Sequence, residues 1–245
     1  MNETIIVFGS SSTIAQAYIQ ELDKKNKPLN LICISRSIKA NNHCKNVSLS
    51  HFETDYSKES LNSIINQINV RQPILTQAII FNGQLHTHNN MPERKLSELD
   101  HDHFNHIMNV NALTPMMCIS SLTPLLHTRS KCTITVLSAR VGSIEDNKLG
   151  GWYSYRASKA ALNMMLQSAA IEIARKVKKA RFFSFHPGTT ETELSKPFRK
   201  NIPQGKLFSP EFVAKQLLHI TQSTFESYPI GEAIFLDWEG KKIPW

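Results

Sequence analysis

The chain has 245 residues, 41% of them hydrophobic and 20% charged, which is an ordinary globular composition and a length that a single α/β domain can reach. No apolar run approaches the ~18 residues of a membrane span, and the amino-terminus lacks the basic start and the cleavage site of a secretory signal, so we expect a cytoplasmic protein with no membrane partner. The net charge of +8 comes from dispersed residues whose densest groups, 24–27 and 175–179, fall at predicted helix ends, so we expect no nucleic-acid partner.

Short apolar runs alternate with amphipathic stretches along the whole chain, and this alternation predicts strands and helices in turn. The predicted strands are residues 4–9, 29–35, 46–50, 78–81, 133–138, 181–185 and 233–236, and the predicted helices are residues 13–25, 60–70, about 104–127, 153–179 and 210–221. This order predicts an α/β fold over residues 1–245: a single-domain Rossmann-type doubly wound parallel sheet of about seven strands with helices on both faces. In such a fold the ligand lies at the carboxyl ends of the strands.

A polar turn that begins with a glycine, GSSSTIA at residues 9–15, joins the first predicted strand to the first predicted helix. Turns of this kind place the pyrophosphate of a dinucleotide at a helix amino-terminus, where hydroxyl and free N–H groups are donors. The residues expected at the phosphates are Gly9, Ser11, Ser12, Thr13 and Ile14. A turn that only caps the helix would have a similar composition, so this segment alone leaves both interpretations open.

The end of the second predicted strand indicates which dinucleotide is bound. An acidic residue there accepts from a ribose 2′-hydroxyl, whereas an arginine accommodates a 2′-phosphate. The sequence has Arg36 between two serines and no acidic neighbour, which favours NADP(H) over NAD(H). The alternative is that Arg36 is a solvated surface residue.

Tyr155 and Lys159 form the most informative pair, because residues at i and i+4 share one face of a helix. Carbonyl reduction needs a proton donor beside the oxygen that becomes an alkoxide, and a neighbouring ammonium lowers the pKa of a phenol. A solvated helix pair is the alternative. The position of the pair after the fifth predicted strand favours catalysis.

Longer stretches around these residues resemble the short-chain dehydrogenase/reductase family, and within it the C-factor-like branch. They are SARVGSI at 138–144, DN at 146–147, GGWYSYRASKAALN at 150–163, HPGTTETELSKPF at 186–198 and IPW at 243–245. The resemblance implies that Tyr155 is the acid/base, that Lys159 holds the nicotinamide ribose and tunes Tyr155, and that Asn111 anchors a proton-relay water. The further cofactor-binding residues that it implies are Asp55, Asn82, Gly83, Pro187, Gly188 and Thr192. It also implies a homodimer or homotetramer.

The sequence departs from the family pattern at several positions. Thr13 and Ala15 stand where the phosphate loop usually has glycine, and Gln84 follows Asn82-Gly83 where the family has Asn-Ala-Gly. The catalytic serine of the family falls at Ala139. Ser138 is the nearest hydroxyl and our candidate for that role, although side chains alternate along a strand and neighbouring residues point to opposite sides.

We therefore expect an NADP(H)-dependent oxidoreductase that interconverts a carbonyl and an alcohol on a small or partly apolar substrate, which we expect the loop at 194–205 to cover. The alternative, which Thr13 and Ala139 support, is a dinucleotide-binding signalling or regulatory protein with little turnover. We expect no metal site, because neither the four cysteines nor the histidine-rich segment has the spacing of zinc ligands. The histidines concerned are His86, His88, His101, His103 and His106.

Overall fold

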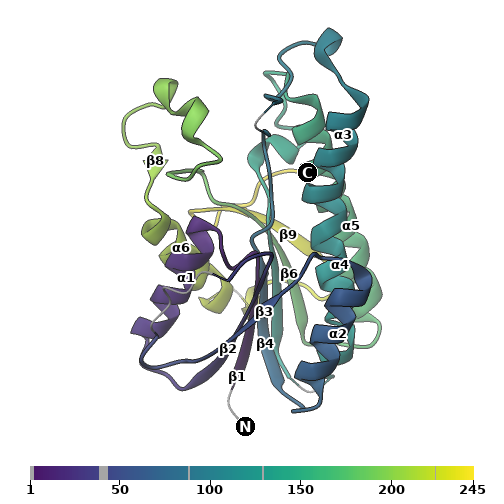
Figure 1. Cartoon of the computed structure of the whole chain (residues 1–245), viewed down its shortest axis with the longest axis vertical. Helices are drawn as coiled ribbons and strands as arrows, with labels where there is room; N and C mark the ends of the chain where they lie inside the picture. Colours follow the sequence, from purple (N-terminus) through teal and green to yellow (C-terminus); the bar gives the residue numbers. More distant parts are fainter. Residues whose placement is uncertain (1–2, 39–43, 88, 129, 224) are drawn as a thin grey trace.

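A parallel sheet of seven strands lies between two helical layers (Figure 1) in the computed structural model, which describes all residues except 1–2, 39–43, 88, 129 and 224. The strands are β1 (Glu3–Phe8), β2 (Leu29–Ser35), β3 (Ser48–Glu53), β4 (Ile74–Ile80), β5 (Cys132–Leu137), β6 (Ala180–His186) and β9 (Ala233–Asp237). Their spatial order is β3-β2-β1-β4-β5-β6-β9, and every neighbouring pair is parallel. The predicted fold class is thereby confirmed.

Helices cover both faces of the sheet (Figure 1). One layer contains α1 (Thr13–Lys24) and α6 (Pro210–Ser223), and the other contains α2 (Lys58–Asn69), α3 (His101–Met108), α4 (Thr114–Ser121) and α5 (Tyr153–Ala174). Within the described residues, no helix combines the length and the apolar character that crossing a bilayer requires.

The first strand shows why both layers form. Ile5 and Val7 belong to the apolar core beneath α1 and α6, whereas Ile6 and Phe8 belong to the core beneath α2, α4 and α5. Alternate residues of a strand point to opposite faces, so a strand covered on both sides must be apolar throughout. This is why the central strands could be recognised as continuous apolar runs.

The boundaries of several elements differ from the prediction. The helix predicted at 104–127 is interrupted by a π-helical turn, η2 (Asn109–Leu113), and the helix predicted at 153–179 ends at Ala174. After Ala174 the chain turns at once, because Val177 is buried in the core just before β6 begins at Ala180. The basic residues at 175–179 therefore lie beyond the helix rather than in its last turn.

Candidate active site

An open cleft of about 840 Å³ lies at the carboxyl ends of β1, β2 and β4, where the strand order reverses. The predicted cofactor residues that line it are Gly9, Ser11, Ser12, Arg36, Asp55, Asn82 and Gly83. The cleft thus brings together residues that follow four different strands. Its position agrees with the general rule for ligands of doubly wound sheets.

Gly9 allows β1 and β4 to approach each other at the cleft. Its φ of +67° lies in the left-handed region, and a Cβ at this position would lie 3.1 Å from both the backbone nitrogen and Oδ1 of Asn82. The Gly9 N–H donates to Ile34 O at 2.9 Å and to the Tyr56 hydroxyl at 3.0 Å. Any larger residue would strain the backbone and displace Asn82.

Tyr56 is a cleft residue that the sequence analysis missed. It lines the cleft next to Asp55, its φ of 66° is left-handed, and burial raises the pKa of its hydroxyl. The left-handed backbone turns its ring back over the end of β1, where the hydroxyl accepts from Gly9. No local sequence signal identifies this contact, because it joins residues 47 positions apart.

The amino-terminus of α1 is organised by local contacts. Ser12 is its N-cap residue, and its hydroxyl accepts from the Ala15 N–H at 3.3 Å. Thr13 is the exposed first residue of the helix, and neither Thr13 nor Ile14 is among the described residues that line the cleft. The phosphate loop is thus a capped turn with both serines on the cleft.

Arg36 and Asp55 stand on the cleft after β2 and β3. Arg36 is exposed and forms no salt bridge within the described part of the chain. The Asp55 carboxylate accepts from the Ser57 N–H at 2.8 Å, and hydrogen bonds from Ser57 lower its pKa. An unpaired guanidinium here is available to an anionic group.

Tyr155 and Lys159 lie one turn apart on α5, with Lys159 Nζ 5.9 Å from the centre of the Tyr155 ring. Lys159 is only 2% exposed, and Nζ donates to Leu137 O at 2.9 Å. Burial raises the pKa of Tyr155 and lowers the pKa of Lys159 to about 7. Burial therefore opposes the lowering of the phenol pKa that the sequence analysis expects from the ammonium.

Asn111 is placed by the π-helical turn η2, which interrupts the long helical region next to the cleft. Its Oδ1 accepts from the Gln84 N–H at 2.7 Å, and its Nδ2 donates to Gln84 O at 2.7 Å and to Ser158 Oγ at 3.0 Å. Only the backbone of Gln84 takes part in the pairing. This explains how a glutamine can replace the usual family residue at position 84.

Ser138 lies away from the cleft. It is buried, and its hydroxyl donates to Asn163 Oδ1 at 2.9 Å, an atom that also accepts from Ser184 Oγ at 2.6 Å. Ala139, the next residue, is partly exposed. The alternation of side chains at the end of β5 thus directs the serine hydroxyl into the protein interior.

Aromatic side chains from three segments gather next to Tyr155. The Trp152 ring is 6.3 Å from the Tyr155 ring and 5.1 Å from the Phe198 ring, and Phe198 is 6.1 Å from the His86 ring. Phe198 belongs to the turn η5 (Lys196–Asn201), and Leu194 just before it lines the cleft. Leu194 and Phe198 of the loop at 194–205 therefore lie on this side of the site.

The segment after β6 completes the same edge of the sheet. Pro187 and Gly188 follow β6 directly, and Thr192 follows the short strand β7 (Thr189–Thr190), which pairs with β8 (Leu207–Phe208). The Thr192 hydroxyl donates to Thr190 O at 3.5 Å. None of the three is among the described residues that line the cleft.

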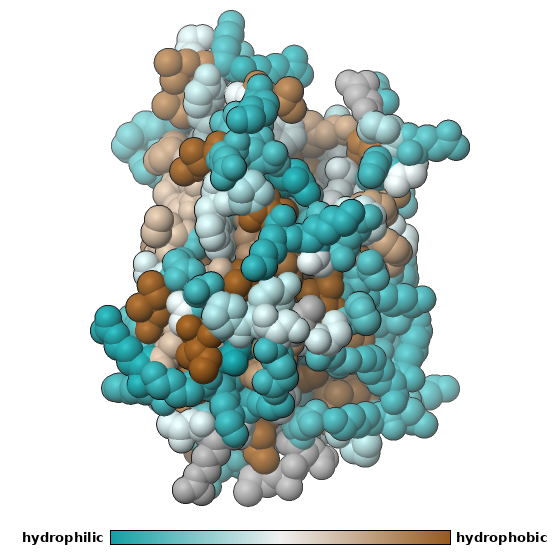
Figure 2. Space-filling view, turned by 180° about the vertical axis from the view of Figure 1, so that it is seen from behind, coloured by the Kyte–Doolittle hydropathy of each residue, from teal (hydrophilic) through white to brown (hydrophobic). Residues whose placement is uncertain are grey.

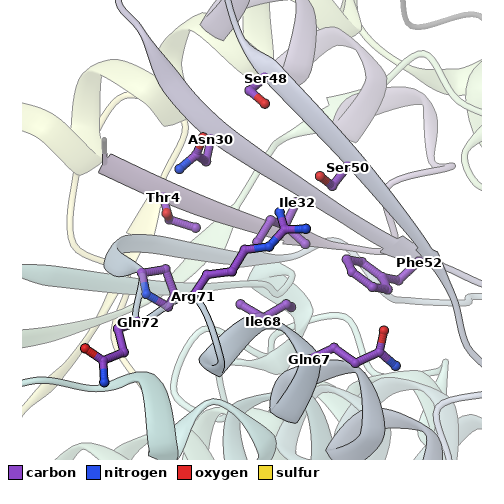
Figure 3. A pocket seen from close by; sticks show the side chains of 11 residues that line it. Thr4, Asn30, Ile32, Ser48, Ser50, Phe52, Gln67, Ile68, Arg71 and Gln72 are labelled. Atoms are coloured by element: carbon purple, nitrogen blue, oxygen red, sulfur yellow. The ribbon is translucent and has the colours of Figure 1, made fainter. Parts of the chain in front are cut away.

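A second cavity, of about 340 Å³, lies far from these residues, beside the end of α2 (Figure 3). Thr4, Asn30 and Ser48 line it in register across the amino-terminal ends of three strands. Arg71 is its basic residue, and it has no acidic lining residue among those described. No predicted site residue reaches it.

Metal-ligating side chains do not gather in the described part of the chain, where no group of three or more histidine, cysteine, aspartate or glutamate residues could hold an ion. His88 lies outside the described residues.

Comparison with known proteins relates this arrangement to characterised relatives. A family model described as short chain dehydrogenase matches residues 3–203. The chain is 24% identical over 239 residues to a 1-hydroxy-2-glutathionyl-2-methyl-3-butene dehydrogenase of Rhodococcus sp. (strain AD45), covering 96% of this chain and 99% of that protein. It is 28% identical over 152 residues to the C-signal protein of Myxococcus xanthus, covering 61% of this chain and 83% of that one. The structure of NADPH-bound carbonyl reductase from chicken fatty liver matches with a TM-score of 0.80 and 20% identity, covering 99% of this chain and 98% of that one, which shows a shared fold.

Proposed function

The chain belongs to the short-chain dehydrogenase family, and from this premise we propose that it is an NADP(H)-dependent oxidoreductase that interconverts a carbonyl and an alcohol on a small or partly apolar substrate. The observation that carries the proposal is the convergence of Lys159 and Asn111 on Gly83 at the cleft, with Tyr155 one turn away. An acid, a cation and a polar relay group meet there at the carboxyl ends of the strands.

The residues present fit a nicotinamide dinucleotide. A Cβ at Gly83 would lie 3.3 Å from Lys159 Nζ and 3.7 Å from Asn111 Oδ1, so the bare backbone leaves room at this point of the cleft. Ser11 and Ser12 would hold the pyrophosphate, Arg36 the 2′-phosphate and Lys159 the nicotinamide ribose. When bound, the cofactor supplies or accepts the hydride.

Tyr155 holds the proton that the carbonyl oxygen receives during reduction. Burial raises the pKa of its phenol, so it is protonated at neutral pH and can act as an acid. Lys159 on the same face of α5 stabilises the phenolate that remains, provided that its amine is protonated. After the reaction the Tyr155 phenolate must regain a proton from solvent, and we assign this transfer to a path beside Asn111. Asn111 is fully buried and hydrogen-bonded to Gln84 and Ser158.

The proposed reaction proceeds without a serine hydroxyl beside the carbonyl. Ser138 donates to Asn163 in the interior, and the partly exposed neighbour is Ala139. Tyr155 is then the side-chain donor to the carbonyl oxygen. Losing one such donor costs about 10²–10³ in kcat in other enzymes, so we expect slow turnover.

The aromatic side chains next to Tyr155 support a partly apolar substrate. Trp152 and Phe198 pack against each other at 5.1 Å, and the Trp152 edge approaches the Tyr155 ring. Rings in this position bury apolar area of a ligand while Tyr155 supplies the polar contact.

We also infer a homodimer or homotetramer, because apolar side chains are exposed on the helical layer of α4 and α5. Met164 is 68% exposed, Ile171 47% and Leu113 47%. Figure 2 shows the molecule from behind, with apolar residues interspersed among polar ones on that face. Large apolar side chains exposed together on one helical layer are typical of contact surfaces between subunits.

A second candidate function is a dinucleotide-binding signalling or regulatory protein with little turnover. Thr13 in the phosphate loop and Ala139 at the serine position favour it, as does the similarity to the C-signal protein.

One experiment separates the two functions. NADPH binding is measured by fluorescence, and NADPH oxidation is followed with a panel of aldehydes, aliphatic ketones, aryl ketones and α-diketones. Turnover of any member supports the oxidoreductase. Tight binding without turnover across the panel favours the regulatory protein, and the absence of binding contradicts both.

A further inference from the structure

A buried carboxylate from another part of the chain contacts the first turn of α5. Glu93, in the segment between β4 and α3, is only 3% exposed. Its Oε2 accepts from the Ser154 N–H at 3.2 Å, and its Oε1 accepts from the Ser154 hydroxyl. Its backbone carbonyl accepts from the Trp152 N–H at 2.5 Å. Ser154 directly precedes Tyr155, so these contacts reach the residue next to the proposed acid.

The helix has no cap of its own. Trp152 occupies the N-cap position but makes no side-chain capping hydrogen bond. Glu93 supplies that cap from 61 positions away. It thereby replaces a local interaction with a tertiary one.

The Glu93 carboxylate has no basic partner in the described part of the chain, where it forms no salt bridge. Arg156, the nearest basic residue along α5, instead donates to the carbonyls of Gly151 and Val141. The charge is therefore held by Ser154 and by the positive end of a 22-residue helix, because a buried carboxylate needs such partners.

The turn before α5 contains one strained residue. Gly150, Gly151 and Trp152 all have positive φ, with values of 66°, 65° and 53°, which glycine adopts without steric cost and tryptophan does not. A bulky residue in this region persists only where its surroundings hold it, and such strain gathers at functional sites. The backbone carbonyl of Glu93 accepts from Trp152, and its carboxylate accepts from Ser154. Glu93 therefore holds the strained residue and the first turn of the helix that follows it.

We propose that Glu93 is a positioning residue for Tyr155. By fixing the first turn of α5 it sets where the phenol meets the carbonyl, and its negative charge favours the protonated phenol that acts as the acid. The proposal rests on the proposed function. Among the described charged groups, Lys159 has its Nζ 5.9 Å from the centre of the Tyr155 ring, and Arg156 follows Tyr155 on α5.

The test is Glu93→Gln, which keeps the size of the side chain and removes its charge. We expect kcat for a reduced carbonyl to fall by about 10–100-fold, with NADPH affinity and KM little changed. The pH limb of kcat/KM that belongs to Tyr155 should move to lower pH by roughly half a unit or more. The proposal is overturned if kcat of Glu93→Gln falls only in proportion to the fraction of protein that is folded and the pH profile of kcat/KM does not move.

A matched control is Asp100→Asn. Asp100 caps α3 through a hydrogen bond from the His103 N–H at 2.8 Å, so the change removes the same charge from a helix without the proposed acid. It should leave kcat and the pH profile unchanged. If Glu93→Gln does not fold, Ser154→Ala removes one hydrogen-bond donor to the carboxylate and keeps its charge, so kcat should fall by less than with Glu93→Gln and the pH profile should stay in place. An unchanged kcat in a folded Ser154→Ala variant contradicts the positioning role.

A readout without turnover keeps this proposal separate from the proposed function. With 3-fluorotyrosine in place of the five tyrosines, the fluorine signal of Tyr155 is assigned by its loss in Tyr155→Phe. Glu93→Gln should move or broaden this signal, and Asp100→Asn should not. An unmoved signal contradicts the positioning role even if no substrate is found, whereas a native protein without turnover contradicts only the proposed function.

Discussion

The two sides of the proposed site are held by different kinds of contact. The α5 wall consists of Lys159 and Asn111, which lie behind the cleft residue Gly83 and are not among the described residues that line the cleft. Both are buried and joined to Leu137, Gln84 and Ser158 by hydrogen bonds between segments far apart in the sequence. On the phosphate-loop wall, Ser11 and Ser12 are partly exposed, Thr13 is exposed, and the capping bond of Ser12 reaches only three residues along the chain.

This difference indicates how each wall responds to substitution. A buried network orients its groups in advance, so a change there alters the chemistry. An open, locally capped turn adjusts to its ligand, so a change there alters affinity by modest amounts.

The largest effect is expected from Tyr155→Phe. The change keeps the ring against Trp152 and removes only the hydroxyl, so kcat/KM should fall by ~10²–10⁴-fold, as is usual for a positioned acid. NADPH affinity, measured by fluorescence, should stay nearly the same. A variant that reduces the carbonyl as fast as the native protein contradicts the catalytic assignment.

Lys159→Ala is the comparison variant for this wall. It should weaken both turnover and NADPH binding, because its amine serves the ribose as well as the phenol. If turnover falls while NADPH affinity is unchanged, Lys159 does not bind the nicotinamide ribose.

Arg36→Ala tests the exposed cofactor-binding side chain that follows β2. A charge-assisted contact to a 2′-phosphate contributes about 1.5–3 kcal/mol, so the variant should lose roughly 10–100-fold in NADPH affinity and keep its NADH affinity. Titration of both cofactors measures the change. Equal affinities of the native protein for NADPH and NADH would contradict the predicted preference.

A smaller effect concerns stability and pH at Lys159. Burial lowers its pKa from 10.5 to about 7, so between these values the unfolded chain binds a proton that the folded protein does not. Stability due to this residue therefore rises with pH through that window, and the cost of a buried ammonium is fully present below it. Between pH 7 and 9 the native Tm should gain roughly 2–5 °C relative to Lys159→Met. If the Tm of the native protein and the Tm of Lys159→Met change with pH in parallel, the pKa of the Lys159 amine is the same in the folded and unfolded states.

The smallest effect is expected from Thr13→Gly. Thr13 is exposed and its side chain is not on the cleft, so NADPH affinity should stay the same or tighten within about threefold. Isothermal titration measures this change. A large loss of affinity would instead identify the threonine hydroxyl as a phosphate ligand and make the two walls more alike.

Much of the site was accessible from sequence because its residues follow strand ends. Gly9, Arg36 and Asn82 each come directly after an apolar strand, and parallel strands end at one edge of the sheet. Tyr56 and Glu93 were missed because their contacts join residues 47 and 61 positions apart, with no local pattern to mark them. Ser138 was our candidate by proximity in sequence, and the structure directs its hydroxyl to Asn163.

By itself the sequence determined the parallel sheet, the two helical layers and the shared face of Tyr155 and Lys159. These features follow from periodicity, because strands repeat every two residues and helices every 3.6. Only the tertiary structure decided the π-helical turn that places Asn111, the inward hydroxyl of Ser138 and the capping of α5 by Glu93. Each of these depends on packing between segments far apart in the chain, where hydrogen-bond partners are set by which elements meet rather than by local sequence.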